Sequence, residues 1–170
     1  MERHEIEQLT RRLVDGELEV VDFVDRLARR GIEQTDAAQV DLDRSRRCGF
    51  SEVVFAEGKE VGALRDIFNV LLKHRHDVLA TRVSEEKAAC LIEMFPNARY
   101  NLVGRTMRIA CEKTDAEKSA AETLRGKVAV ISAGTSDMPI AEEARETAEW
   151  TGAEVVYIQD VGVAGPHRLR

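Results

Sequence analysis

Residues Val128 to Asp137 read VAVISAGTSD, and this stretch decides the fold of the C-terminal part of the chain. An apolar run of three β-branched residues and one alanine is followed at once by small and polar residues, a pattern typical of a strand that ends in a loop. A helical stretch from Met138 to about Gly152 comes next, and a second apolar run covers Glu154 to Ile158. This order predicts one β-α-β unit with two parallel strands.

A single β-α-β unit leaves two strand edges and one face of its sheet uncovered. After the second strand the chain continues only through the loop Gln159 to His167 and three more residues. We therefore expect residues 127–170 to be the start of a larger domain, which either more of the same protein or other chains complete.

The composition is typical of a soluble, globular protein: 44% of the 170 residues are hydrophobic and 33% are charged. The apolar runs are too short to span a bilayer, and the N-terminus has no signal-peptide core. A net charge of -6 argues against nonspecific nucleic-acid binding. Three cysteines without a CxxC pair fit a reducing compartment. We expect a cytoplasmic protein with no nucleic-acid or membrane partner.

The segment before the β-α-β unit is predicted to form an α+β domain over residues 1–112. Two amphipathic helices begin it, and the second ends near Arg30-Gly31, where the glycine favours a helix end. Further strands are predicted at 40–43, 52–56 and 77–81, helices at 61–74 and 85–95, and a β-hairpin at 99–103 and 106–110. Residues 113–126 are predicted to be a partly helical linker.

The loop after the first strand of the β-α-β unit is a candidate ligand site, because such sites form at the carboxyl ends of parallel strands. Gly134 permits a positive φ and lets a ligand approach backbone N–H groups. Thr135 and Ser136 add hydroxyls, and the following helix N-terminus favours an anion such as phosphate.

Negative charge at the start of this helix limits where a phosphate can lie. Asp137 is already there, and Glu142 and Glu143 would repel a phosphate on the helix axis. We therefore expect phosphate at Gly134 and the two hydroxyls, with Asp137 accepting hydrogen bonds from ribose. The alternative is that residues 136–139 are only a helix start, since capping sequences are common.

The loop after the second strand should lie beside the first, because parallel crossovers usually bring consecutive strands together. It reads DVGVAGPHR from Asp160 to Arg168. His167 is suited to proton transfer at neutral pH, and Arg168 suits a phosphate or carboxylate. The alternative is a surface turn with an incidental histidine.

Together the two loops, AGTSD at 133–137 and DVGVAGPHRL at 160–169, resemble the LarB family. That family makes the nickel-pincer nucleotide cofactor, and its C-terminal half is similar to phosphoribosylaminoimidazole carboxylase (PurE). The N-terminal part also resembles LarB, in the segments DRSRRCGF at 43–50, EVV at 52–54, EGK at 57–59 and ATR at 80–82. The resemblance extends over nearly the whole chain.

The resemblance implies an α/β fold: an N-terminal α+β domain, then the first β-α-β unit of a flavodoxin-like, PurE-type three-layer domain over residues 127–170. It also implies a homo-oligomer. The reaction would be carboxylation of the pyridinium ring of nicotinic acid adenine dinucleotide, then hydrolysis of its phosphoanhydride to release AMP. CO₂ or bicarbonate would be the co-substrate, and Mg²⁺ would neutralise the diphosphate.

Site residues carry over from the family by position. Ser136 and Asp137 match the pair that holds phosphate and ribose in the carboxylase relatives. His167 and Arg168 match the pair whose histidine handles protons on the substrate. Purine carboxylases typically have a serine where this chain has Gly134, which favours the LarB reaction over the purine one.

LarB chains continue into a late segment with the cysteine proposed to attack the pyridinium ring, and that segment is absent here. Cys48, Cys90 and Cys111 do not replace it: Cys48 lies among arginines that could lower a thiol pKa, but a structural role is the alternative, and Cys90 is expected in the core. We therefore expect the 170-residue chain alone to be inactive. A purine carboxylase or mutase, and a non-catalytic nucleotide-binding or assembly protein, are the alternatives.

Other charged clusters remain open in function. Arg44, Arg46 and Arg47, together with Lys59, would suit a second phosphate or a carboxylate, or form a solvated face. No metal site is expected at the histidines of residues 74–76, because no third ligand accompanies them.

Overall fold

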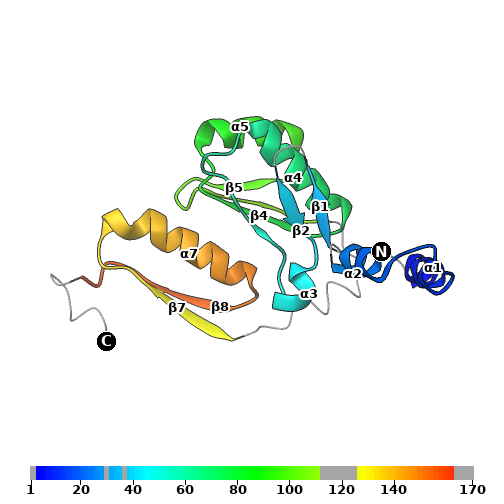
Figure 1. Ribbon diagram of the computed structural model, residues 1–170. Helices are drawn as coiled ribbons and strands as arrows, with labels where there is room; N and C mark the ends of the chain where they lie inside the picture. Colours follow the sequence, from blue (N-terminus) through cyan, green and yellow to red (C-terminus); the bar gives the residue numbers. More distant parts are fainter. Residues whose placement is uncertain (1–2, 29–30, 36–37, 112–125, 163–170) are drawn as a thin grey trace.

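The computed structural model describes residues 3–28, 31–35, 38–111 and 126–162 (Figure 1). The helices are α1 (Arg3–Val14), α2 (Val20–Ala28), α3 (Arg44–Cys48), α4 (Val61–Lys73), α5 (Glu85–Met94) and α7 (Met138–Trp150), with a 3₁₀ turn η1 (Thr135–Asp137). The strands are β1 (Ile32–Gln34), β2 (Gln39–Asp41), β3 (Val53–Phe55), β4 (Val78–Thr81), β5 (Arg99–Asn101), β6 (Thr106–Ile109), β7 (Lys127–Ile131) and β8 (Glu154–Ile158).

The N-terminal part is built on a four-stranded sheet of order β3-β4-β6-β5. β3 and β4 are parallel, whereas β4 pairs antiparallel with β6 and β6 with β5. All four residues of β4 are buried, as expected for a central strand that is covered on both faces. The β5–β6 hairpin confirms the prediction around Gly104-Arg105.

The core of this part is formed by α4 and α5 against the sheet. Leu64, Ile67, Phe68 and Leu71 recur at helical spacing on α4 and are all buried, as their pattern predicts. The ring of Phe68 lies 5.7 Å from that of Phe95, centroid to centroid, in a tilted aromatic pair. Among the described residues, the buried members of this apolar cluster run from Val40 to Ile109.

Two short secondary-structure elements and the exposure of one cysteine differ from the predictions. β1 and α3 were not predicted, because three and five residues are too few to show a period. Cys90, expected in the core, is exposed. The buried side of α5 is formed by Ala88 and Leu91, and Cys90 lies on the other side of the helix.

The C-terminal part is a β-α-β unit, as predicted. β7 and β8 are parallel and in register from Lys127↔Glu154 to Ile131↔Ile158, and α7 packs on both strands. Together with the mixed N-terminal sheet this is an α/β fold. The other face of the small sheet is open, since Ile131 is 54% and Val156 48% exposed.

Helix α7 lies between the two sheets, because it contacts β4 as well as its own strands (Figure 1). The C-terminal unit is therefore packed against the N-terminal sheet through a helix. Within the described ranges, no helix is both long and apolar enough to cross a membrane.

Candidate functional site

The loops that follow β7 and β8 lie side by side, as their connection predicts. The N–H of Val161 donates to the carbonyl of Ser132 at 3.2 Å, and that of Gly162 donates to the carbonyl of Ala133 at 2.9 Å. These bonds continue the pairing of β7 and β8 beyond the ends of both strands. They create a shared floor at the carboxyl edge of the sheet, where α/β proteins bind ligands.

Gly162 is required by this close approach. A Cβ atom there would lie 2.8 Å from the carbonyl oxygen of Ala133 and 3.3 Å from its carbonyl carbon. The first of these distances is shorter than any ordinary carbon–oxygen contact, so a side chain would push the two loops apart. A glycine is therefore needed at position 162 so that the two loops can lie this close together.

Neither close packing nor backbone conformation requires a glycine at position 134. The positive φ expected there is not observed. The φ of −143° and ψ of 175° of Gly134 are ordinary extended values, so no positive φ is used. A Cβ atom there would meet nothing within 4 Å. The fold would accept a larger residue, and the glycine leaves open space directly over the loop backbone.

Asp137 organises this loop instead of capping α7. Its Oδ2 accepts from the N–H of Gly134 at 3.0 Å, and its own N–H donates to the Gly134 carbonyl at 3.0 Å. The side chain makes no capping bond to α7, whose start is favoured by Pro139 in the first turn. The Gly134 N–H, expected to bind phosphate, is thus already occupied by a carboxylate.

The hydroxyls of Thr135 and Ser136 are available for a ligand. Both residues are exposed, and the described part of the chain records no hydrogen bond to either hydroxyl. With Asp137 they form the single turn η1 that stands above the loop floor. Two donors and a carboxylate on one turn can bind a phosphate and an adjacent sugar hydroxyl.

Ser132 is a polar residue that the sequence analysis did not single out. It is only 4% exposed, and its Oγ has no hydrogen-bond partner among the described residues. A buried hydroxyl without a partner costs about 1–3 kcal/mol, so a ligand that bonded it would recover part of this free energy. Its position at the very end of β7, before the small-residue loop, was the available signal.

His167 and Arg168 lie outside the described residues, so their placement beside the first loop stays a prediction. The second loop contains Asp160, whose φ of 55° lies in the left-handed region. Farther along this loop lies the contact of Gly162 with Ala133.

The N-terminal arginines are used within their own domain. Arg47 forms an ion pair with Asp41, and Arg46 lies 3.6 Å from Asp43. The guanidinium of Arg44 stands over the ring of Phe50 at 5.5 Å. A role of this cluster in phosphate binding stays a hypothesis.

Metal ligands are sparse in the described ranges, which contain no group of three or more His, Cys, Asp or Glu side chains that could hold an ion. His74 contacts Glu33, and His76 Nδ1 lies 3.1 Å from the Ser51 hydroxyl. Burial lowers the pKa of His76, and the nearby His74 lowers it further.

These features define an α/β protein with a candidate nucleotide-binding loop pair attached to a mixed α+β sheet. Residues 32–112 match the family model described as the LarB/PurE-like N-terminal domain. This part of the chain is therefore a LarB/PurE-like N-terminal domain, and the resemblance seen in its sequence segments is confirmed for residues 32–112.

The chain is also similar to an uncharacterized protein of Methanocaldococcus jannaschii, with 33% identity over 142 residues. The matched region covers 81% of this chain and 53% of that protein. The chain thus spans about half the length of this curated relative.

Proposed function

We propose that this chain provides the nucleotide-binding loops of an enzyme of nickel-pincer cofactor biosynthesis. The reaction is carboxylation of the pyridinium ring of nicotinic acid adenine dinucleotide, followed by hydrolysis of the phosphoanhydride and release of AMP. CO₂ or bicarbonate is the co-substrate. The LarB/PurE-like domain at residues 32–112 supports this choice of family.

The observation that carries the proposal is the loop pair at the carboxyl edge of β7 and β8. Its floor is fixed by the backbone bonds of Val161 and Gly162 to the first loop. A Cβ atom at Gly134 would meet nothing within 4 Å, and the side-chain hydroxyl of the floor residue Ser132 is buried with no partner among the described residues. A site with unused donors and room for backbone approach is suited to a phosphorylated ligand.

Each residue of the turn has a role in this proposal. The hydroxyls of Thr135 and Ser136 donate to phosphate oxygens. One oxygen of Asp137 accepts from Gly134, which leaves the other free to accept from a ribose hydroxyl. The Asp137 carboxylate thus stays in place while it binds the sugar. The Gly134 N–H partly balances the negative charge of this carboxylate, which limits its repulsion of the phosphate.

His167 would handle a proton or orient the transferred carboxylate, and Arg168 would bind phosphate. Mg²⁺ would enter with the diphosphate, since the described residues hold no cluster of three ligands for it. A cytoplasmic homo-oligomer that covers the open face of the small sheet completes the proposal.

The test is isothermal titration of the 170-residue chain with nicotinic acid adenine dinucleotide, AMP and aminoimidazole ribonucleotide. We expect the dinucleotide to bind, and Ser136→Ala and Asp137→Asn each to weaken binding about tenfold, the scale of one charge-assisted hydrogen bond. Thr10→Ala, which removes a hydroxyl on α1, is the matched control and should change nothing.

Three results would contradict the proposal in different ways. Binding of aminoimidazole ribonucleotide alone would favour a purine carboxylase or mutase. Binding of every nucleotide with equal affinity would favour a non-catalytic binding or assembly protein. No binding at millimolar ligand would remove the loop pair as a nucleotide site.

A further inference from the structure

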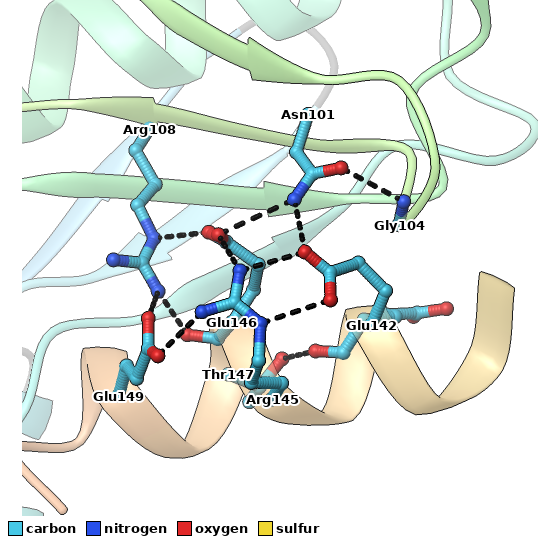
Figure 2. Close-up of polar contacts among 9 residues, drawn as sticks. Asn101, Gly104, Arg108, Glu142, Arg145, Glu146, Thr147 and Glu149 are labelled. Carbon is cyan, nitrogen blue, oxygen red and sulfur yellow. Dashed lines mark hydrogen bonds and ion pairs between the residues drawn. The ribbon is translucent and has the colours of Figure 1, made fainter. Parts of the chain in front are cut away.

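Helix α7 is held from its second side by side chains of the N-terminal sheet (Figure 2). The Nδ2 of Asn101 on β5 lies 2.7 Å from Glu142 Oε1. The Nε of Arg82, just after β4, lies 2.7 Å from Glu143 Oε2. Both glutamates are mostly buried, with 15% and 18% of their side chains exposed. These contacts hold the N-terminal half of α7.

Arg108 of β6 holds the other half of the helix. Its Nε lies 2.6 Å from Glu146 Oε2, and its Nη2 donates to the carbonyl of Glu146. The same nitrogen lies 3.7 Å from Glu149 Oε2. A guanidinium that binds both a side chain and the backbone of one helix restrains its position more than a single ion pair does.

Arg145 links the acidic residues of α7 to one another. Its guanidinium lies 2.6 Å from Glu142 Oε1, 2.9 Å from Glu146 Oε1 and 2.5 Å from Glu149 Oε1. Hydrogen bonds to Glu142, the strongest influence, and to Glu149 raise the pKa of Arg145. The bond between Arg145 and Glu142 lowers the pKa of Glu142, and Asn101 lowers it further. The carboxylates are thereby fixed in the orientation that the N-terminal sheet binds.

The sheet and helix also approach closely at Gly104, in the turn of the β5–β6 hairpin. A Cβ atom there would lie 3.1 Å from Glu142 Cγ and 3.1 Å from the backbone nitrogen of Glu143. The N–H of Gly104 donates to Asn101 Oδ1 at 3.1 Å. The side-chain amide of Asn101 therefore connects the hairpin turn to Glu142 of α7, as Figure 2 shows.

The backbone that presents Arg82 is itself constrained. Arg82 has a φ of 57°, in the left-handed region that costs a non-glycine residue about 1 kcal/mol or more. The next residue, Val83, is held on both sides: its N–H donates to the Arg105 carbonyl at 2.9 Å, and its carbonyl accepts from Tyr100 Oη at 2.9 Å. The domain maintains this conformation, and it directs Arg82 to Glu143.

The contacts at Glu142 and Glu143 lie about one and a half helical turns from the candidate site, and those of Arg108 lie farther along α7. Glu142 and Glu143 follow Asp137 by five and six residues on one continuous helix and its 3₁₀ turn. The backbone hydrogen bonds between successive turns make so short a stretch of helix nearly rigid, so a displacement at Glu142 reaches its start. The floor at Ser132 is fixed separately, by bonds to the second loop. Because α7 packs on β7 and β8 on one side and on the N-terminal sheet on the other, the position of the η1 turn relative to that floor depends on both sets of contacts.

We propose that Arg82, Asn101 and Arg108 are positioning residues for the nucleotide site: through α7 they set the distance of the η1 turn from the loop floor. The N-terminal domain thus controls the affinity of the loop pair for its ligand. This inference rests on the proposed function for its ligand, while its mechanical part, the coupling of the sheet to the loop, can be measured alone.

The experiment uses the 170-residue chain with Arg82→Gln and, as a second variant on the other partner, Glu143→Gln. Hydrogen exchange of peptides that cover residues 132–138 reports on the loop, and peptides of α4 report on the core. We expect exchange in the loop to increase roughly fivefold in both variants, the scale of a partly buried ion pair, with no change in α4. Arg65→Gln, which breaks an exposed ion pair with Asp66, is the matched control.

The second readout is the affinity for nicotinic acid adenine dinucleotide. The double variant Arg82→Glu/Glu143→Arg exchanges the two charges and should restore the ion pair. Positioning predicts weaker binding in each single variant and partial recovery in the pair. Unchanged hydrogen exchange of the loop in both single variants would overturn the inference. Equal increases of hydrogen exchange in the loop and in α4 would overturn it too, because they would show that these side chains only stabilise the fold as a whole. If the unaltered chain does not bind the dinucleotide, the proposed function fails while loop exchange still tests the coupling.

Discussion

Gly104→Ala tests the contact between the N-terminal sheet and α7 directly. The added methyl would lie 3.1 Å from Glu142 Cγ and from the Glu143 nitrogen, and 3.2 Å from the Glu142 carbonyl carbon. Ordinary contacts begin at 3.4 Å, so the hairpin and the helix must separate by a few tenths of an ångström. Two of the three opposing atoms are backbone, so the strain cannot be relieved by a rotamer change.

The magnitude follows from two opposing effects. Overpacking of this kind costs about 1–3 kcal/mol, and the separation also lengthens the bond from Asn101 to Glu142. Alanine restricts the unfolded chain, which stabilises by about 0.4–1 kcal/mol. We expect a net destabilisation of about 1–2 kcal/mol, or a Tm lower by roughly 2–8 °C for a chain of this size.

The assay is thermal unfolding followed by circular dichroism and by tryptophan fluorescence. Trp150 is the single tryptophan. It lies at the end of α7 and lines a cavity with Arg99 and Arg108 of the N-terminal sheet, so its emission reports on this interface. We expect the fluorescence transition to shift at least as far as the transition seen by circular dichroism.

Gly62→Ala is the matched control, because Gly62 lies in α4 and a Cβ there meets nothing within 4 Å. It should stabilise the protein by about 0.5–1 kcal/mol, since alanine favours a helix. If Gly104→Ala proved as neutral or stabilising as Gly62→Ala, the close packing of the hairpin on α7 would be refuted.

Two further predictions concern the loop pair and the pH. Gly134→Ala should leave Tm within about 1 °C, because nothing lies near its Cβ, yet weaken dinucleotide binding about tenfold by filling the space above the loop. Gly162→Ala should instead lower Tm, because its Cβ would meet the Ala133 carbonyl at 2.8 Å; equal Tm values for the two variants would contradict this contrast. The pKa of Glu142 is lowered from its ordinary value of 4.5, chiefly by the hydrogen bond from Arg145. This carboxylate therefore stabilises the fold at neutral pH, and the stabilisation is lost as pH falls below about 4.5 through the lower folded-state pKa. Urea unfolding between pH 7 and 3 should show a shallower loss in Glu142→Gln.

Local pattern was enough to place most elements. The helical spacing of apolar residues located α4, and the alternation around Gly104-Arg105 located the β5–β6 hairpin. The order of strand, small-residue loop, helix and strand located β7, α7 and β8. The motifs in the N-terminal part also indicated the LarB resemblance, which the family match at residues 32–112 confirms. The domain limits at 1–112, 113–126 and 127–170 stay predictions.

Details of the site depended on contacts that no local pattern contains. The φ of Gly134 and the bond from its N–H to Asp137 result from how one turn closes, and several closures suit the same residues. The burial of the Ser132 side chain is a property of the packed structure, which the residues around it in the chain do not specify. Exposure of Cys90 depends on which side of α5 meets the sheet.

The sequence by itself determined the elements and the family of the N-terminal part, because periodicity and turn chemistry act between residues close in the chain. Only the tertiary structure decided what the acidic residues of α7 do. In the sequence Glu142 and Glu143 appear as negative charges that would repel a phosphate. In the fold they are bound by Asn101 and Arg82, about forty and sixty residues earlier, because ion pairing depends on distance in space, which a sequence does not contain.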